Sequence, residues 1–182
     1  VVARDRADGT HLEELRAYQE LHGMEAERVT TRQARQLEPA LSPALAGAVQ
    51  IAGDHQVQPR RFTRALIAAS EAAGVRFEPY AVHDVDEVDA EQVLVAAGLG
   101  AAGITGWYKG ANPLDLRPVY GDILHVRVPD HQYPLLTRVV RGFVEDRPVY
   151  LIPREDGTLT IGATTREDGR DQPQAQGVHQ LL

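Results

Sequence analysis

Apolar side chains recur at helical spacing over residues 10–22. They occupy every third position along one side: Leu12, Leu15, Tyr18 and Leu21. Thr10 and Glu13 form the T-x-x-E pattern of a capping box, and Gly23 suits the left-handed C-terminal cap. The pattern therefore predicts an amphipathic helix over 10–22.

A second helix is predicted over residues 59–73, where Pro59 suits the first turn and Gly74 the C-terminal cap. One side of this helix carries an apolar stripe that we expect to be buried: Phe62, Ala65, Leu66, Ala69 and Ala73. A shorter helix is predicted over 31–37, and 177–182 resembles the first turns of another.

Short apolar or alternating runs predict strands over six segments: 47–53, 75–79, 81–85, 92–97, 122–128 and 134–140. Residues 149–165 predict a hairpin with Asp156-Gly157 at its turn, and Val1-Val2-Ala3 resembles the end of a strand. We therefore predict an α+β fold: a mixed, largely antiparallel sheet with helices, plus a small β-α-β-like portion around residues 59–103.

Charge and composition narrow the possible functions. The chain has 182 residues, a formal net charge of −7 and no cysteine. The acidic balance argues against a nucleic-acid or membrane-surface partner, and the lack of cysteine excludes disulfides and thiolate catalysis. No apolar stretch approaches the length of a membrane span and no signal peptide is visible, so we expect a cytoplasmic protein.

One motif has the form of a dinucleotide-binding fingerprint. The segment "VLVAAGLGAAG", residues 93–103, contains G-x-G-x-x-G at Gly98, Gly100 and Gly103. A dinucleotide-binding fingerprint needs a long helix after the third glycine. The residues that follow, "ITGWYKGANP", contain two glycines and a proline and predict a poor helix. We therefore expect a glycine-rich turn, with no phosphate role for Gly103.

Other catalytic patterns are weak. The seven histidines form no H-x-H or H-x-x-x-H pair, so no metal site is predicted. Ser42 and Ser70 do not lie in a G-x-S-x-G motif, which argues against a serine hydrolase. Asp54 and His55 precede the predicted 59–73 helix; they either approach a cofactor or shape the entry to that helix.

Longer stretches of sequence resemble the flavin-dependent amine oxidases of the D-amino-acid-oxidase family. The similarity begins with residues 35–79, "RQLEPALSPALAGAVQIAGDHQVQPRRFTRALIAASEAAGVRFEP", and continues in "VLVAAGLGA". Three further segments are most similar to the glycine oxidases of thiamine biosynthesis: "RPVYGDIL" (117–124), "RPVYLIPREDGTLTIGATT" (147–165) and "EDGRD" (167–171).

The resemblance implies an organisation in three segments. Residues 1–56 and 106–182 would form two parts of a substrate domain, and 57–105 part of an FAD-binding domain. We expect the chain to be the middle of a longer enzyme, with the pyrophosphate-binding motif before Val1 and a substrate-binding arginine after Leu182. On that expectation, the chain alone neither holds FAD tightly nor turns over substrate.

For the cofactor, the resemblance implies contacts from four residues. Val82 matches a position whose backbone faces the adenine of FAD. Ala97, Gly98 and Leu99 lie at the end of a strand that passes close to the ADP half of the cofactor.

For the substrate, the resemblance implies two residues and assigns no catalytic residue to this chain. Tyr150 matches a substrate-side tyrosine on the strand over the flavin. Thr165 falls where relatives often carry an apolar residue that lines the substrate pocket.

The activity implied is hydride transfer from a small amino acid or amine to FAD. The resulting imine hydrolyses, and oxygen reoxidises the flavin to give hydrogen peroxide. Glycine is the expected substrate and a homo-oligomer is possible. The alternatives are a sarcosine or D-amino-acid oxidase or dehydrogenase of the same family, or a noncatalytic interaction module.

Overall fold

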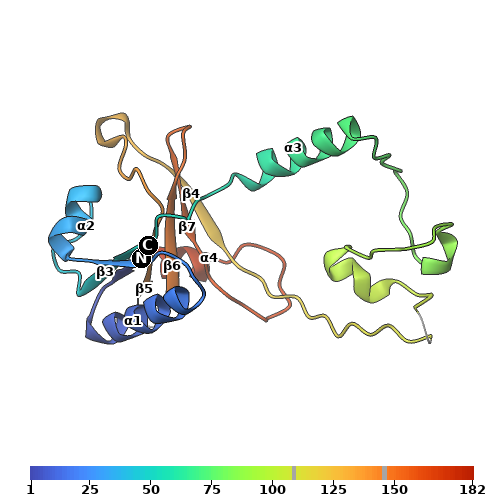
Figure 1. The fold of residues 1–182 in the computed structure, drawn as a ribbon, viewed down its shortest axis with the longest axis horizontal. Helices are drawn as coiled ribbons and strands as arrows, with labels where there is room; N and C mark the ends of the chain where they lie inside the picture. The colour runs from blue at the N-terminus through green and yellow to red at the C-terminus, as the bar shows by residue number, and fades with distance from the viewer. Residues whose placement is uncertain (108–109, 145–146) are drawn as a thin grey trace. The chain divides into compact units, whose positions relative to one another are not determined.

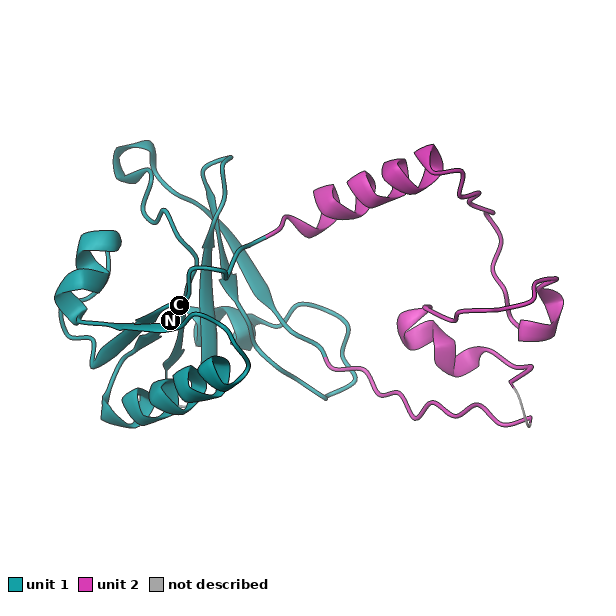
Figure 2. Ribbon diagram, viewed as in Figure 1, with its two compact units in different colours: residues 1–56, 120–182 teal, residues 57–119 magenta. Residues whose placement is uncertain are grey.

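A computed structural model describes residues 1–107, 110–144 and 147–182 of the chain. It divides into two compact units (Figure 2). Unit 1 is built from two separate segments, Val1–Gln56 and Tyr120–Leu182, and unit 2 is the intervening segment Val57–Val119.

Unit 1 is organised around a seven-stranded sheet with the strand order β2-β3-β1-β5-β6-β7-β4 (Figure 1). The strands are β1 (Val2–Ala3), β2 (Glu27–Val29), β3 (Gly47–Gln50), β4 (Ile123–Arg127), β5 (Val140–Val144), β6 (Arg147–Pro153) and β7 (Thr158–Gly162). All neighbouring pairs are antiparallel except β1 and β5, which are parallel. The predicted mixed, largely antiparallel sheet is thus confirmed.

The hairpin of β6 and β7 turns at Asp156-Gly157, as the sequence predicts. Gly157 adopts a φ of 79°, a left-handed conformation that favours glycine. The Asp156 carboxylate accepts hydrogen bonds from the backbone N–H and the hydroxyl of Thr158, at 3.0 and 2.6 Å. These local interactions end β6 and start β7 in a defined register.

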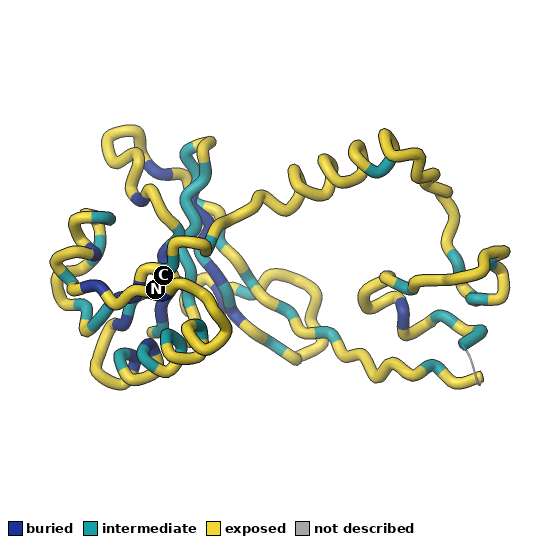
Figure 3. Tube along the Cα trace, in the orientation of Figure 1, coloured by how far each residue is buried: buried dark blue, intermediate teal, exposed yellow. Residues whose placement is uncertain are grey.

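The two faces of the sheet differ. On the core face, one row across β5, β6 and β7 consists of Val140, Leu151 and Ile161, which belong to an apolar cluster with Leu136 and Leu159. The opposite face carries the row Arg141, Tyr150, Gly162 and Ile123, and we call it the Tyr150 face. Burial in Figure 3 is concentrated in this sheet and the helices packed against it.

Two helices cover the β1–β3 end of the sheet, on opposite faces. Leu12 of α1 (Arg6–Leu21) packs with Ala3 and Val49. Ala34 of α2 (Thr31–Leu37) packs with Ala48, whose side chain points to the other face because strand residues alternate. The predicted 31–37 helix is confirmed, and the C-terminal helix is α4 (Ala175–Leu181).

The start of α1 corrects the predicted cap. The helix begins at Arg6, and its capping box consists of Asp5 and Asp8. Asp5 accepts from the backbone N–H groups of Ala7 and Asp8, at 2.9 and 3.0 Å. Thr10 lies inside the helix, so the prediction that it begins the helix is wrong; the acidic residues upstream satisfy the first free N–H groups instead.

The strand predicted over 134–140 is also wrong, because β5 begins only at Val140. Leu136 is buried in the core, but the backbone beside it does not join a ladder. The N–H of Thr137 donates to both carboxylate oxygens of Glu38, at 3.2 and 3.0 Å. A buried side chain thus takes the place of a neighbouring strand.

In unit 2, α3 (Pro59–Ala72) confirms the predicted helix, and Gly74 follows it with a φ of 88°. Its apolar stripe is exposed, contrary to prediction, with Phe62 and Leu66 each 50% exposed. No residue of α3 is buried. The apolar spacing therefore predicted the helix correctly but not the burial of its stripe.

The β-α-β-like portion predicted around 59–103 is not formed. Over residues 57–107 and 110–119, the structure has α3 and two short 3-10 helices, η1 (Val85–Glu87) and η2 (Gly98–Gly103), but no strand. A single isolated bridge joins Asp84 to Thr105. The strands predicted over 75–79, 81–85 and 92–97 are therefore wrong for this structure, because a strand needs a paired neighbour.

Among the described helices, none combines the length and apolar character required to cross a membrane.

The two possible caps of α1 can be separated by mutation. We expect Asp5→Ala to lower the free energy of unfolding by about 1 kcal/mol, because two N–H groups lose their acceptor. Thr10→Ala is the matched control and should change it by less than about 0.5 kcal/mol. Urea unfolding followed by circular dichroism at 222 nm measures both; equal losses would contradict the Asp5 cap.

The Glu38 carboxylate should be important for stability, because it is 4% exposed and joins the two segments of unit 1. Glu38→Ala leaves the Thr137 N–H without its acceptor and should cost about 3 kcal/mol. Glu38→Gln keeps one acceptor oxygen and should cost less. Urea midpoints for the two variants test this order, and a Glu38→Ala variant as stable as the parent would refute it.

Candidate functional site

The Tyr150 face of unit 1 contains the first of the residues that the sequence associates with substrate. Tyr150 lies on β6, opposite Arg141 of β5 on one side and Gly162 of β7 on the other. Its side chain is half-buried. Arg141 turns away to pair with Asp54, with an N···O distance of 3.2 Å. The phenol of Tyr150 is therefore the principal polar group of this row.

Thr165 follows β7 and is exposed. The residues on either side of it, Thr164 and Arg166, both direct their side chains to Asp122. Side chains alternate along an extended chain, so Thr165 points away from Asp122. Ile123 follows Asp122 and also points away from it, toward the Tyr150 face. The structure thus brings Tyr150 and Thr165 to one face of the sheet.

A hydrogen-bonded cluster holds the chain on either side of Thr165. The Thr164 hydroxyl accepts from the N–H of Asp122 at 2.8 Å and donates to its carboxylate at 3.2 Å. Arg166 donates to the same carboxylate at 3.2 Å and to Asp168 at 2.9 Å. Asp122 and Arg166 are largely buried, with 11% and 17% of their side chains exposed. The position of Thr165 is therefore well defined.

Sequence reasoning missed Asp122, Arg166 and Gly162. The first two are 44 residues apart, so no local spacing relates them. Gly162 has no such signal either, because a two-residue turn at Asp156-Gly157 would place Ala163 opposite Tyr150, whereas the observed register places Gly162 there.

The residues associated with the cofactor lie in unit 2. Val82 is half-buried, whereas Ala97, Gly98 and Leu99 are exposed at the start of η2. Gly98 has a φ of 55°, and a Cβ at this position would meet no atom within 4 Å. No α-helix follows Gly103 over residues 104–107 and 110–119. The glycine-rich segment is thus an open turn and lacks the helix of a dinucleotide fingerprint.

A polar contact joins the two halves of this region. Thr105 donates from its N–H to the carbonyl of His83 at 2.9 Å and from its hydroxyl to Asp84 at 2.5 Å. The hydroxyl of Thr105, followed by the N–H of Asp86, lowers the pKa of the Asp84 carboxyl. Segments 83–85 and 104–106 therefore lie side by side, which places Val82 next to one end of the glycine-rich turn.

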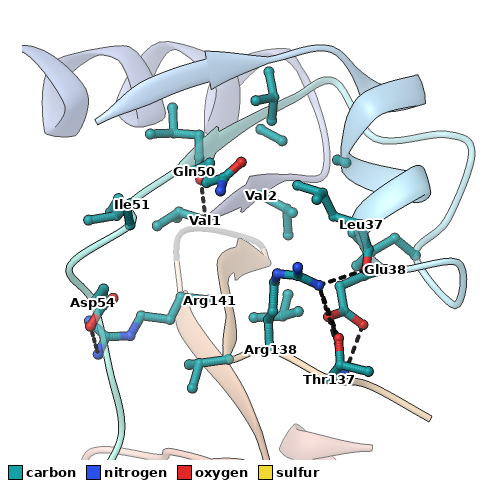
Figure 4. A pocket seen from close by; sticks show the side chains of 18 of the residues that line it. Val1, Val2, Leu37, Glu38, Gln50, Ile51, Asp54, Thr137, Arg138 and Arg141 are labelled. Carbon is teal, nitrogen blue, oxygen red and sulfur yellow. Dashed lines mark hydrogen bonds and ion pairs between the residues drawn. The ribbon is translucent and has the colours of Figure 1, made fainter. Parts of the chain in front are cut away.

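Unit 1 also contains a cavity of about 370 Å³ beside the N-terminal end of β1 (Figure 4). The ends of β3 and β5, α2 and the segment before β5 line it. Both acidic side chains in its lining have partners. Glu38 accepts from Thr137 and Arg138, and Asp54 pairs with Arg141. Tyr150 and Thr165 are not among the residues that line it, but Arg141, the neighbour of Tyr150 on β5, belongs both to the cavity lining and to the Tyr150 face.

His55 and Asp54 both line this cavity, before α3 begins. Across the described residues, no group of three or more His, Cys, Asp or Glu side chains is arranged to hold a metal ion.

Comparison with known proteins places these features in a family. The glycine oxidase of Geobacillus kaustophilus is 34% identical over 170 residues, which cover 85% of this chain and 43% of that protein. The bifunctional protein ThiO/ThiG of Synechocystis sp. is 30% identical over 159 residues, covering 81% of this chain and 24% of that protein.

The fold comparison agrees. The crystal structure of glycine oxidase from Geobacillus kaustophilus matches 99% of this chain with a TM-score of 0.76 and 28% identity, and the match covers 50% of that structure. The chain spans between 21% and 49% of the length of the curated relatives it matches. The family model "FAD dependent oxidoreductase" (DAO) matches residues 1–182 in full. The chain therefore belongs to the DAO family of FAD-dependent oxidoreductases.

Proposed function

We propose that the full-length protein is an FAD-dependent amine oxidase that acts on glycine or a similarly small amino acid. The observation that carries the proposal is the common face of Tyr150 and Thr165, the two residues that the family resemblance associates with substrate. The similarity of this chain to one protein named glycine oxidase and to another named ThiO/ThiG supports the choice of substrate class.

The chemistry of the Tyr150 face suits such a substrate. A small amino acid presents a carboxylate and an amine close together. The hydroxyls of Tyr150 and Thr165 can each donate to a carboxylate oxygen, and a charge-assisted hydrogen bond of this kind is stronger than a neutral one. Thr165 presents a hydroxyl where relatives often carry an apolar side chain. We infer that the pocket favours a short, polar substrate.

The overall reaction follows from this binding mode. FAD, when bound, supplies the two-electron acceptor for the oxidation of the C–N bond. The amino acid loses two electrons and two protons to become an imine, and water then converts the imine to a keto acid and ammonia. For glycine the acid is glyoxylate, and dioxygen is reduced to hydrogen peroxide. The role of this chain is to bind and orient the substrate.

One feature of unit 2 would allow its backbone to come close to FAD. Ala96, Ala97 and Gly98 have little or no side chain, and the space around Gly98 is open. Backbone at such a segment can come close to a ligand. We propose that Ala97, Gly98 and Leu99 contact the ADP half of FAD and that Val82 lies near the adenine. By the same resemblance, the reaction would belong to thiamine biosynthesis.

Peroxide formation by the full-length protein tests the substrate class. We expect the purified, FAD-loaded enzyme to produce hydrogen peroxide with glycine, sarcosine and D-alanine, and to have the highest kcat/KM with glycine. A coupled peroxidase assay measures all three. A preference for D-alanine or sarcosine would favour the alternative members of the family, and no peroxide with any of them would refute the proposal.

The roles of the two hydroxyls can be tested separately. We expect Tyr150→Phe and Thr165→Val each to raise KM for glycine by about tenfold or more, because each removes one hydrogen bond to a charged group. Tyr18→Phe, an exposed tyrosine on α1, is the matched control and should leave KM unchanged. Unchanged KM in both variants would show that the Tyr150 face does not bind the substrate.

A further inference from the structure

Gly162 has a close aromatic neighbour in Tyr150. Gly162 is buried at the end of β7, opposite Tyr150 of β6 and Ile123 of β4. The three atoms nearest to the position of a Cβ at 162 are Cζ, Oη and Cε2 of Tyr150, the last at 2.8 Å. Real Cβ atoms essentially never come so close to another atom. Any side chain at 162 would therefore push the ring away.

A left-handed φ does not explain this glycine. Its φ lies outside the left-handed region, whereas those of Gly98 and Gly157 lie within it. Any residue can adopt the extended conformation, and glycine weakens the interior of a strand. What distinguishes glycine at 162 is therefore the absence of a Cβ, which leaves room for the ring of Tyr150.

This contact sets the direction of the Tyr150 side chain. Directly opposed residues on antiparallel strands have Cβ positions about 5 Å apart. A ring whose far end covers Gly162 must therefore lie across the sheet, from β6 toward β7. It cannot stand upright from the sheet. Arg141, the neighbour on the other side, is directed to Asp54 and leaves that orientation undisturbed.

The hydroxyl of Tyr150 consequently ends over β7, just before the chain reaches Thr165. The hydrogen bonds of Thr164 and Arg166 to Asp122 hold Thr165 on the same face. The two hydroxyls thus face the same side of the sheet, and Gly162 determines the position of the first of them.

We propose that Gly162 is a positioning residue of the substrate site. It allows the Tyr150 ring to lie flat against β7, which keeps its hydroxyl on the face toward which Thr165 points. Gly162 itself touches no substrate in this arrangement. The identity of the ligand rests on the proposed function, whereas the contact between Gly162 and Tyr150 does not.

Kinetics of the FAD-loaded, full-length enzyme test the positioning role. We expect Gly162→Ala to raise KM for glycine about tenfold while kcat changes less, because the displaced phenol no longer meets the substrate. Gly9→Ala is the matched control, since a Cβ at Gly9 meets nothing within 4 Å, and it should leave KM unchanged. A Gly162→Ala enzyme with reduced stability but normal KM would overturn the proposal.

A stability cycle tests the contact without any activity. Gly162→Ala should lower the urea midpoint when residue 150 is tyrosine, but not in a Tyr150→Ala background, where the space is vacant. An equal loss in both backgrounds would show that Gly162 does not accommodate Tyr150. Should Gly162→Ala fail to fold by itself, a folded double variant supports the contact and an unfolded one contradicts it.

The two proposals fail in different ways. An enzyme that oxidises none of the three amino acids, but shows the expected stability cycle, contradicts the proposed function and the substrate role of Gly162 while leaving the contact intact. An active enzyme without the cycle contradicts the positioning role alone.

Discussion

The antiparallel pairing of β6 with β7 determines which side chains of unit 1 face the core and which face outward. A shift of this register by one residue would turn Leu151 outward and Tyr150 into the core, since side chains alternate along a strand. The Asp156-Gly157 turn opposes such a shift, because Thr158 donates twice to Asp156. The apolar row on one face and the Tyr150 face on the other both depend on this short hairpin.

Long-range polar contacts then join the two segments of unit 1. Glu38 accepts from Thr137 across 99 positions of sequence, and Gln56 donates to the carbonyl of Pro153 at 2.6 Å. The second contact holds the point where the chain leaves unit 1 close to the end of β6. The buried Glu38 carboxylate would otherwise lack partners, so its contact with Thr137 favours one arrangement of the two segments.

Local signals in the sequence predicted much of the secondary structure of unit 1. The helix over 31–37 and the hairpin at Asp156-Gly157 depend on neighbouring residues, and both are found as expected. The start of α1 was misplaced because two capping patterns compete within a few residues. The strands expected in unit 2 failed because pairing is a property of two segments, and periodicity within one segment cannot supply the partner.

In the candidate site, too, some residues could be identified from the sequence and others only from the fold. Tyr150 and Thr165 came from family resemblance, and their role in binding remains a prediction. Asp122 and Arg166 are brought together only by the fold, so periodicity and spacing gave no sign of them. Gly162 is likewise a contact that only the fold reveals, since both its pairing with Tyr150 and the orientation of the ring depend on the folded hairpin. Local sequence therefore predicts the hairpin that carries the site better than it predicts the contacts that position the side chains of the site.

The place of β1 in the sheet has a consequence for synthesis on the ribosome. β1 lies between β3, which is made early, and β5, which begins only at Val140. The central pairing of unit 1 therefore waits until unit 2 has been translated, and the edge of β1 that later pairs with β5 stays unpaired during that interval. The longer this interval lasts, the longer the edge of β1 is open to pairing with a wrong strand.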